Sequence, residues 1–404
     1  MYSEIKTREK KTEAEETERL HSEALVIDTL STYIGVCLPG EGKQCHVDQL
    51  IREGVDISKI TEIELDERIG DLCDKLGLQG TADPWDWWKQ SGVDVIHTTL
   101  GINAGTGEQE AYRKTIKDLA RHTLRFDKSD KLVKITKADD IVRAKREGKY
   151  GVILGVQNLN ILTGDLNYIE LFYYFGIRIL QLTYNLRNLF GNGCTERKDE
   201  GLSELGIQAI RKMNDLGILL DLSHCGIQTT LEAIETSKSP VAFTHTFCRA
   251  IRNHDRGKTD EQLRALRKNN GYMGILLVPD FLGDGTKEVS LNDFLDHVDH
   301  AVEILGVERV GIGTDYGAGY TSKEVLKAMR ENRKKEIEKW GVDSIGWRPC
   351  HRRDEGPQPY VKGYRDWRDF PNITKALKSR GYSSEHIIGI LGQNFLRVFR
   401  DAVG

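Results

Sequence analysis

Three side chains that can bind a metal or transfer a proton each follow a short apolar run of this sequence. His224 ends Leu-Asp-Leu-Ser-His, His245 ends Ala-Phe-Thr-His, and Asp315 ends Gly-Ile-Gly-Thr-Asp. If these runs are parallel strands of one barrel, their carboxyl ends share one face, and the three side chains converge there. Converging imidazole and carboxylate groups hold a metal and activate its water in barrel hydrolases. A lone histidine at a strand end is more often only hydrogen-bonded, so the argument depends on all three residues.

Three further polar residues belong to the same pattern. Gln157 ends the apolar run 152–156, and Tyr184 follows the run 177–182. His97 lies inside another apolar run and could point into the barrel mouth, toward a substrate. The other histidines fall in expected helices or loops, where surface positions are the simplest interpretation.

The elements that must position these residues are short strands alternating with amphipathic helices. Eight runs rich in Val, Ile or Leu are expected to be strands: residues 25–28, 93–100, 152–156, 177–182, 218–222, 241–244, 272–277 and 310–314. Each run is nearly continuous in apolar character, as in strands buried on both faces. Helical patterns such as 203–216 and 291–305 lie between them. The alternation predicts an α/β fold, a (β/α)8 TIM-type barrel, with a doubly wound open sheet as the alternative.

The alternation also predicts the domain organisation. We expect a charged leader at 1–22 and a single barrel domain over 23–404. Insertions at 39–89 and 321–370 interrupt the pattern after the first and the last strand, so both should lie on the carboxyl-terminal face. Three tryptophans in or beside the first insertion have two open interpretations, a packed lid or the wall of an apolar pocket: Trp85, Trp87 and Trp88.

Composition and charge exclude some classes of partner. The chain has 404 residues, 39% of them hydrophobic and 30% charged, with a formal net charge of −4. It lacks the concentrated basic field that nucleic acids and anionic membranes require, and no apolar run approaches the roughly 20 residues that span a bilayer. The leader has no apolar core typical of a secretory signal. We therefore expect a cytoplasmic protein with no nucleic-acid or membrane partner, whose seven cysteines are free thiols.

Six motifs in the same order resemble the membrane dipeptidase (renal dipeptidase, peptidase M19) family of amidohydrolase-like metal-dependent hydrolases. They are Val-Ile-Asp at 26–28, Leu-Asp-Leu-Ser-His at 220–224, Pro-Val-Ala-Phe-Thr-His at 240–245, Arg-Asn at 252–253, Val-Gly-Ile-Gly-Thr-Asp at 310–315 and Leu-Gly-Gln-Asn-Phe-Leu-Arg-Val-Phe at 391–399. Each motif is weak alone, but their shared order and spacing are specific. The resemblance runs from about Leu25 to the C-terminus.

The resemblance implies a barrel that holds two zinc ions and cleaves dipeptides. His224 and His245 match the ligands of the second metal, and Asp315 matches the aspartate that handles the proton. Arg252, followed by Asn253, matches the arginine that grips the substrate carboxylate. Bidentate carboxylate binding suits the planar guanidinium group.

Four positions depart from the family pattern. Leu30 and Thr32 stand where a histidine and an aspartate should hold the first metal. Gln157 replaces the bridging glutamate, and Tyr184 replaces the histidine that stabilises the tetrahedral intermediate. Leucine cannot ligate, and neutral threonine and glutamine are poor substitutes for carboxylates. We therefore expect the first metal to be absent.

The departures leave three hypotheses. The first is a metallohydrolase that uses one divalent metal, zinc by expectation, on His224, His245 and Gln157, with Asp315 as acid/base and Tyr184 donating to an oxyanion. Its substrate would be a small carboxylate-bearing amide or amino-acid derivative. The second is lyase, decarboxylase or isomerase chemistry on the same barrel, with or without metal. The third is a non-catalytic binding protein. Family analogy leaves a homodimer open.

Overall fold

The chain was analysed as a computed structural model. It describes residues 14–31, 43–60, 64–65, 68–69, 71–72, 84–101, 107–283, 287–315, 323–343, 346–348 and 360–404. Residues 1–13 of the expected leader lie outside this range, and so does Thr32. Residues 14–23 are helical, and no helix in the described ranges is both long and apolar enough to cross a bilayer.

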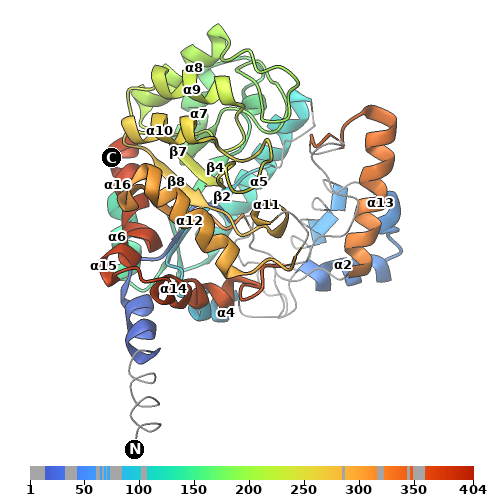
Figure 1. The fold of residues 1–404 in the computed structure, drawn as a ribbon. Coiled ribbons are helices and arrows are strands. Elements are labelled where there is room, and N and C mark those ends of the chain that lie inside the picture. Colours follow the sequence, from blue (N-terminus) through green and yellow to red (C-terminus); the bar gives the residue numbers. More distant parts are fainter. Residues whose placement is uncertain are drawn as a thin grey trace, which may run out of the picture.

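Parallel strands form the wall of a barrel, as the sequence predicted (Figure 1). They are β1 (Ile27–Asp28), β2 (Val95–Thr99), β4 (Tyr150–Val156), β5 (Ile177–Gln181), β6 (Leu219–Asp221), β7 (Ala242–Thr246), β8 (Tyr272–Ile275) and β9 (Val310–Ile312). They pair in this order. The backbone N–H of Thr29 donates to the carbonyl of Ile312 at 3.0 Å, which joins the first strand to the last. The open-sheet alternative is therefore wrong.

A ninth strand, β3 (Leu132–Lys134), was not predicted. It pairs with the start of β4, off the path of the barrel. Only Leu132 of its three residues is fully buried. A three-residue strand with this little apolar character gives no periodic signal.

Helices alternate with the strands and cover the barrel. They are α2 (Lys43–Arg52), α4 (Pro84–Ser91), α5 (Glu108–Lys128), α6 (Ala138–Arg146), α7 (Asn167–Tyr174), α8 (Glu204–Leu216), α9 (Ile227–Thr236), α10 (Asp260–Lys268), α11 (Pro279–Leu282), α12 (Leu291–Leu305), α13 (Lys323–Trp340), α14 (Phe370–Ser379), α15 (Ser384–Ile388) and α16 (Asn394–Val403). Short 3-10 turns include η1 (Ile57–Lys59) and η6 (Trp367–Asp369). Ser203 caps α8 by accepting the N–H of Gly206, and Ser290 starts α12 with a capping box. These caps explain why the helical patterns begin where they do.

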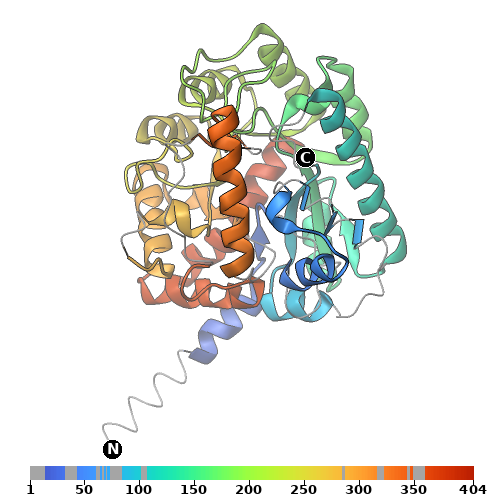
Figure 2. The same cartoon turned by 90° about the vertical axis from the view of Figure 1, so that its right-hand side faces the viewer.

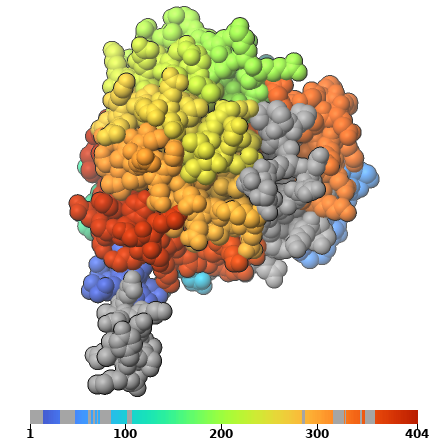
Figure 3. Space-filling view, in the orientation of Figure 1, coloured from blue at the N-terminus to red at the C-terminus, as the bar shows by residue number. Residues whose placement is uncertain are grey.

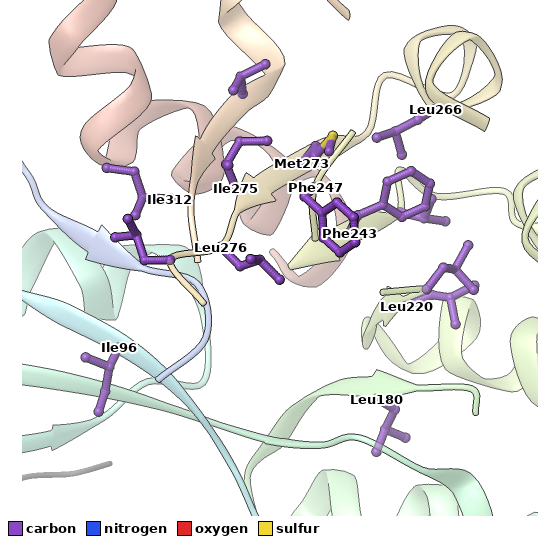
Figure 4. Close-up of a cluster of buried hydrophobic side chains, with 14 of the residues drawn as sticks. Ile96, Leu180, Leu220, Phe243, Phe247, Leu266, Met273, Ile275, Leu276 and Ile312 are labelled. Carbon is purple, nitrogen blue, oxygen red and sulfur yellow. The ribbon is translucent and has the colours of Figure 1, made fainter. Parts of the chain in front are cut away.

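Apolar side chains from the strands pack against the surrounding helices. Figure 4 shows Phe243 of β7 and Met273 of β8 in the same cluster as Leu266 of α10. A second cluster joins Ile27 and Ile153 to Phe395 of α16. Figure 3 shows α12 and α14 (orange to red) lying against each other on one outer face. Gln157, Tyr184, His224 and Asp315 follow strands, and His245 lies near the end of β7; these positions are at the end of the barrel away from Tyr150, the first residue of β4.

The two insertions contact each other beside the barrel. Helix α13 packs on η1, and Asn332 donates to the carbonyls of Ile57 and Ile60 at 3.3 and 2.7 Å. Figures 1 and 2 show α13 standing beside the barrel as a separate long helix next to α2. The assignment of one domain over 23–404 stays a prediction.

The tryptophans of α4 pack at the amino end of the barrel. Trp85 and Trp88 stack on Tyr150, the first residue of β4, with ring centroids 5.6 and 4.5 Å apart. Trp88 also packs against Trp367. Because the strand ends that carry His224 and His245 lie at the opposite end, these rings belong to the core rather than to a substrate pocket.

Candidate metal centre

The structure brings the two expected histidine ligands into contact. His245 lies on β7, and His224 follows β6 by three residues. Their Nε2 atoms are 3.0 Å apart, and both side chains are buried, with 3% and 0% of their surface exposed. This juxtaposition is the centre of the candidate site.

Neighbouring side chains fix which nitrogen of each ring carries the proton. The oxygen of Asn185 lies 2.7 Å from Nδ1 of His224 and accepts its proton. The hydroxyl of Thr244 donates to the carboxylate of Asp221 at 2.6 Å, so it must accept from Nδ1 of His245, 2.8 Å away. Each ring is therefore protonated on Nδ1 and has an unprotonated Nε2.

Two bare nitrogen lone pairs at this distance repel each other unless a cation or a proton lies between them. A proton is disfavoured, because burial holds the pKa of His224 and His245 well below that of an ordinary histidine. The positive charge of Arg256 lowers both values further. Histidines that bind a divalent metal are neutral and usually donate their second ring N–H to a neighbouring group, and both His224 and His245 meet these conditions.

Gln157 completes this side of the site. Its amide nitrogen donates to Nε2 of His245 at 2.9 Å, and 8% of its surface is exposed. Rotation about its last side-chain bond would place the amide oxygen at the same position, where it could serve as a neutral metal ligand. Within the described residues, no three His, Cys, Asp or Glu side chains gather as a metal-binding group. Among the described residues, the groups that could hold a cation here are two imidazoles and one amide.

Leu30, the residue expected to replace a ligand of the first metal, has an apolar side chain. Leu30 is fully buried. The carboxylate of nearby Asp28 accepts three hydrogen bonds within the fold. They come from the backbone N–H and the hydroxyl of Thr314, at 2.8 and 2.6 Å, and from Nε1 of Trp367 at 3.3 Å. Burial raises the pKa of Asp28 to about 7.

Asp315 has the properties of an acid/base group. Burial raises its pKa to about 7, although Arg256 opposes that shift. Its φ angle is +53°, an unusual value for a residue other than glycine. Such strain persists only where the surroundings impose it, and it is common at active sites. A carboxyl group with a pKa near neutrality is well matched to proton transfer.

The ring of Tyr184 lies directly against the ring of His224. The two rings stack, with centroids 4.1 Å apart and planes 21° from parallel. The side chain of Tyr184 is half-buried. Its ring thus lies beside the histidine pair.

The arginine predicted to anchor a carboxylate is not the one that lies beneath the site. Arg252 is half-buried and contacts the carbonyl of Asn253 at 3.4 Å, and Asn253 itself is exposed and accepts from Arg249. Arg256 is fully buried and donates to the carbonyls of Ser223 and His245 at 2.6 and 2.5 Å.

Arg256 was missed because the sequence holds no signal of its burial. Its charge influences both histidines and Asp315. Its bonds to the backbone at Ser223 and His245 fix the segments that carry the two rings. It therefore acts as a structural and electrostatic support of the site.

His97 lies on β2 and is buried. Its Nδ1 donates to the carbonyl of Thr29 at 2.8 Å, and its buried Nε2 has no hydrogen-bond partner among the described residues. A Cβ atom added to Gly155 would come within 2.1 Å of that Nε2, so the ring fills the space that this glycine leaves. A role of His97 in substrate binding stays a prediction.

The fold and the site define a parallel α/β barrel with a histidine-based centre at the carboxyl ends of its strands. The family model described as "Membrane dipeptidase (Peptidase family M19)" matches residues 86–333 and 337–403. The chain belongs to this family.

Two fungal relatives and two solved structures are similar to the chain. Dipeptidase tcpJ of Claviceps purpurea is 26% identical over 275 residues, which is 68% of this chain, and an uncharacterized dipeptidase of Schizosaccharomyces pombe is 30% identical over 270 residues, or 65%. The match spans 56% of the length of each. An amidohydrolase from Pseudomonas aeruginosa superposes with a TM-score of 0.71 at 26% identity, covering 96% of this chain and 99% of the other.

A metallopeptidase from Rhodobacter sphaeroides, solved with a phosphinate mimic of L-Ala-D-Ala, gives a TM-score of 0.67 at 18% identity. It covers 94% of this chain and 99% of the other. This likeness supports the barrel fold alone.

Proposed function

We propose that this protein is a dipeptidase-like metallohydrolase that uses a single divalent metal, zinc by expectation. The substrate class is a small amide that carries a carboxylate, such as a dipeptide or an amino-acid derivative. The supporting observation is that the Nε2 atoms of His224 and His245 lie 3.0 Å apart in a buried setting, while the Nδ1 atom of each ring is bonded to a neighbouring side chain. Family membership supports the hydrolytic reaction.

His224, His245 and the amide oxygen of Gln157 would hold the metal. When bound, a divalent cation lowers the pKa of a water and polarises a carbonyl group. Asp315, with a pKa of about 7, takes a proton from the attacking water and delivers it to the leaving amine. The hydroxyl group of Tyr184 donates to the oxygen of the tetrahedral intermediate. Arg252 is assigned to the substrate carboxylate by family spacing.

Lyase or isomerase chemistry is the second candidate. The feature in its favour is the buried Leu30, an apolar residue where the resemblance implies a ligand of the first metal, together with the retained Asp315. Hydrolysis and this alternative differ in whether solvent oxygen enters the product. Reaction in water enriched in 18O would label the product carboxylate only if the protein is a hydrolase.

The test of the metal centre is a zinc titration of the full chain by calorimetry, with metal content measured by elemental analysis. We expect about one metal per chain, and loss of binding in His224→Ala and His245→Ala. His300→Ala is a matched control, because His300 is a part-buried histidine that bonds Asp260 away from the site. Equal metal content in the wild type and both site variants would refute the proposal.

A panel of dipeptides and N-acyl amino acids tests the reaction. We expect turnover that depends on added zinc and is abolished in His245→Ala. Turnover of the same substrate by the metal-free protein would contradict a metal-assisted mechanism. Binding without turnover of any panel member would favour the non-catalytic alternative.

A further inference from the structure

A short segment of the second insertion, Gly346–Arg348, is seated on the loop that follows β5. The backbone N–H of Thr195 donates to the backbone carbonyl of Asn185 at 3.0 Å. The Thr195 hydroxyl, which has one proton to donate, lies 2.7 Å from that same carbonyl and 2.9 Å from the backbone carbonyl of Gly346. Nε of Arg348 donates to the carbonyl of Thr195 at 2.7 Å. Thr195 therefore ties this segment to Asn185, the residue that accepts the Nδ1 proton of His224.

The packing at Gly346 is close. Its φ angle is +89°, and a Cβ atom added there would lie 3.0 Å from the Cβ of Asn185 and 3.0 Å from the Cγ of Leu186. Glycine allows the backbone of the insertion to lie directly against Asn185. A larger side chain at position 346 would displace either the insertion backbone or Asn185.

Trp347 anchors the same segment on the opposite side. Its ring packs edge-on to His254, with centroids 5.4 Å apart, and against Phe281 at 5.7 Å. Asp343 accepts the N–H of Trp347 at 2.8 Å and fixes the turn. The segment thus bridges the loop after β5 and the loop after β7, and 6% of Trp347 is exposed.

The position of Asn185 determines whether the histidine pair can receive a cation. While its oxygen faces Nδ1, His224 keeps Nε2 bare. If Asn185 moved out of reach, His224 could place its proton on Nε2 and donate it to Nε2 of His245, 3.0 Å away. That internal hydrogen bond would close the pair to a metal.

We propose that the Gly346–Arg348 segment is a positioning element for the metal centre. It holds Asn185, and through it the Nδ1-protonated tautomer of His224, with Arg348 as the positioning residue. This inference deepens the proposed function and rests on it for its consequence in metal binding. The hydrogen-bond relay itself, from Arg348 through Thr195 and Asn185 to His224, is independent of any reaction.

The experiment reads the tautomer of His224 in the full-length, metal-free protein. Histidine labelled with 15N gives distinct proton–nitrogen correlations for the two tautomers, and the signals of His224 are those lost in His224→Ala. We expect the wild type to carry the proton on Nδ1. In Arg348→Ala and in the nearly isosteric Thr195→Val, we expect a second population with the proton on Nε2. Zinc affinity should fall by about 10- to 100-fold in both variants, as for other residues that orient a ligand.

Arg397→Ala is the matched control. Arg397 is 29% exposed against 24% for Arg348, and it likewise donates to backbone carbonyls, those of Asn270 and Gly271. Those carbonyls precede β8, at the amino end of the barrel. The control should leave both the tautomer and zinc affinity unchanged.

Two results would overturn the inference. One is an Nδ1-protonated signal that persists unchanged in folded Arg348→Ala and Thr195→Val, and the other is a wild type already protonated on Nε2. Because the tautomer is read without metal or substrate, failure of the proposed function would appear separately, as absent zinc binding or turnover in a wild type with the expected tautomer.

Discussion

The backbone N–H of Asp315 donates to the backbone carbonyl of Leu30 at 2.9 Å. From the motif spacing, we predict that Leu30 replaces a metal ligand of the family and that Asp315 is its proton-handling carboxylate. The bond joins the ends of β1 and β9 and helps to hold Asp315 at its φ angle of +53°. The backbone at Leu30 therefore supports Asp315, the residue proposed as acid/base.

Activity should follow the ionisation of Asp315. A general base acts as the carboxylate, and burial raises its pKa to about 7, so kcat/KM should rise with pH and level off above about 7. Asp315→Asn should lose about 10²- to 10⁴-fold in kcat and should also lose that pH limb. The measurement is a pH–rate profile of both proteins. A limb near pH 7 that persists in Asp315→Asn would assign the titration to another group.

The same raised pKa predicts the sign of a stability effect. Because the folded protein binds the Asp315 proton more tightly than the unfolded chain does, this group stabilises the fold fully below its ordinary pKa. That contribution is lost as the pH rises towards about 7. At pH 8, Asp315→Asn should therefore unfold in urea at no lower concentration than the wild type. Marked destabilisation at this pH would show that the carboxylate has a favourable partner.

Thr244→Val should weaken the metal site without emptying the core. The substitution keeps the shape but removes the hydroxyl that accepts from His245 and donates to Asp221. We expect about 10- to 100-fold weaker zinc binding by calorimetry, and a loss of about 1–3 kcal/mol in the free energy of unfolding, because Asp221 loses a buried donor. Thr230→Val is the control. Thr230 lies in α9 and is also fully buried, but its hydroxyl donates to the carbonyl of Gly226, the residue that precedes this helix. Comparable loss of zinc affinity in the control would contradict the specific role of Thr244.

Arg256 and Arg252 should behave differently on substitution. Arg256→Met strands the carbonyls of Ser223 and His245 in the core, so we expect it to cost about 3 kcal/mol or more of unfolding free energy. Arg252→Ala should change stability by no more than about 0.5 kcal/mol. If Arg252 grips the substrate carboxylate, its loss should raise KM at least about tenfold with little change in kcat. An unchanged KM would disprove that assignment.

Restoring the family residues should recruit a second metal. The triple variant Leu30→His, Thr32→Asp and Gln157→Glu adds an imidazole and two carboxylates, the ligand types that zinc prefers. We expect metal content to rise from about one to about two per chain by elemental analysis. The control is the same triple variant with Leu30→Ala instead of Leu30→His, and it should not bind an additional metal. An unchanged count in a folded triple variant would show that Leu30 or Gln157 was aligned to the wrong family position.

The sequence by itself determined the barrel. Strands buried on both faces need nearly continuous apolar runs, and all eight runs that were predicted on this basis lie in the barrel wall. It also placed His224, His245 and Asp315 near the carboxyl ends of different strands, which parallel pairing then brings to one end, although His245 lies within β7 rather than after it. The family followed from motifs whose order and spacing the chain retains.

Only the tertiary structure decided how those residues are supported. The tautomer of His224 depends on Asn185, which is 39 residues away, and Asn185 is held through Thr195 by Gly346, 151 residues further on. The burial of Arg256, which places a cation beneath both histidines, likewise depends on carbonyls of other segments. The periodicity and spacing of residues predict whether a segment forms a helix or a strand. Proton positions and electrostatic support depend on contacts between segments distant in sequence, and these exist only once the chain has folded.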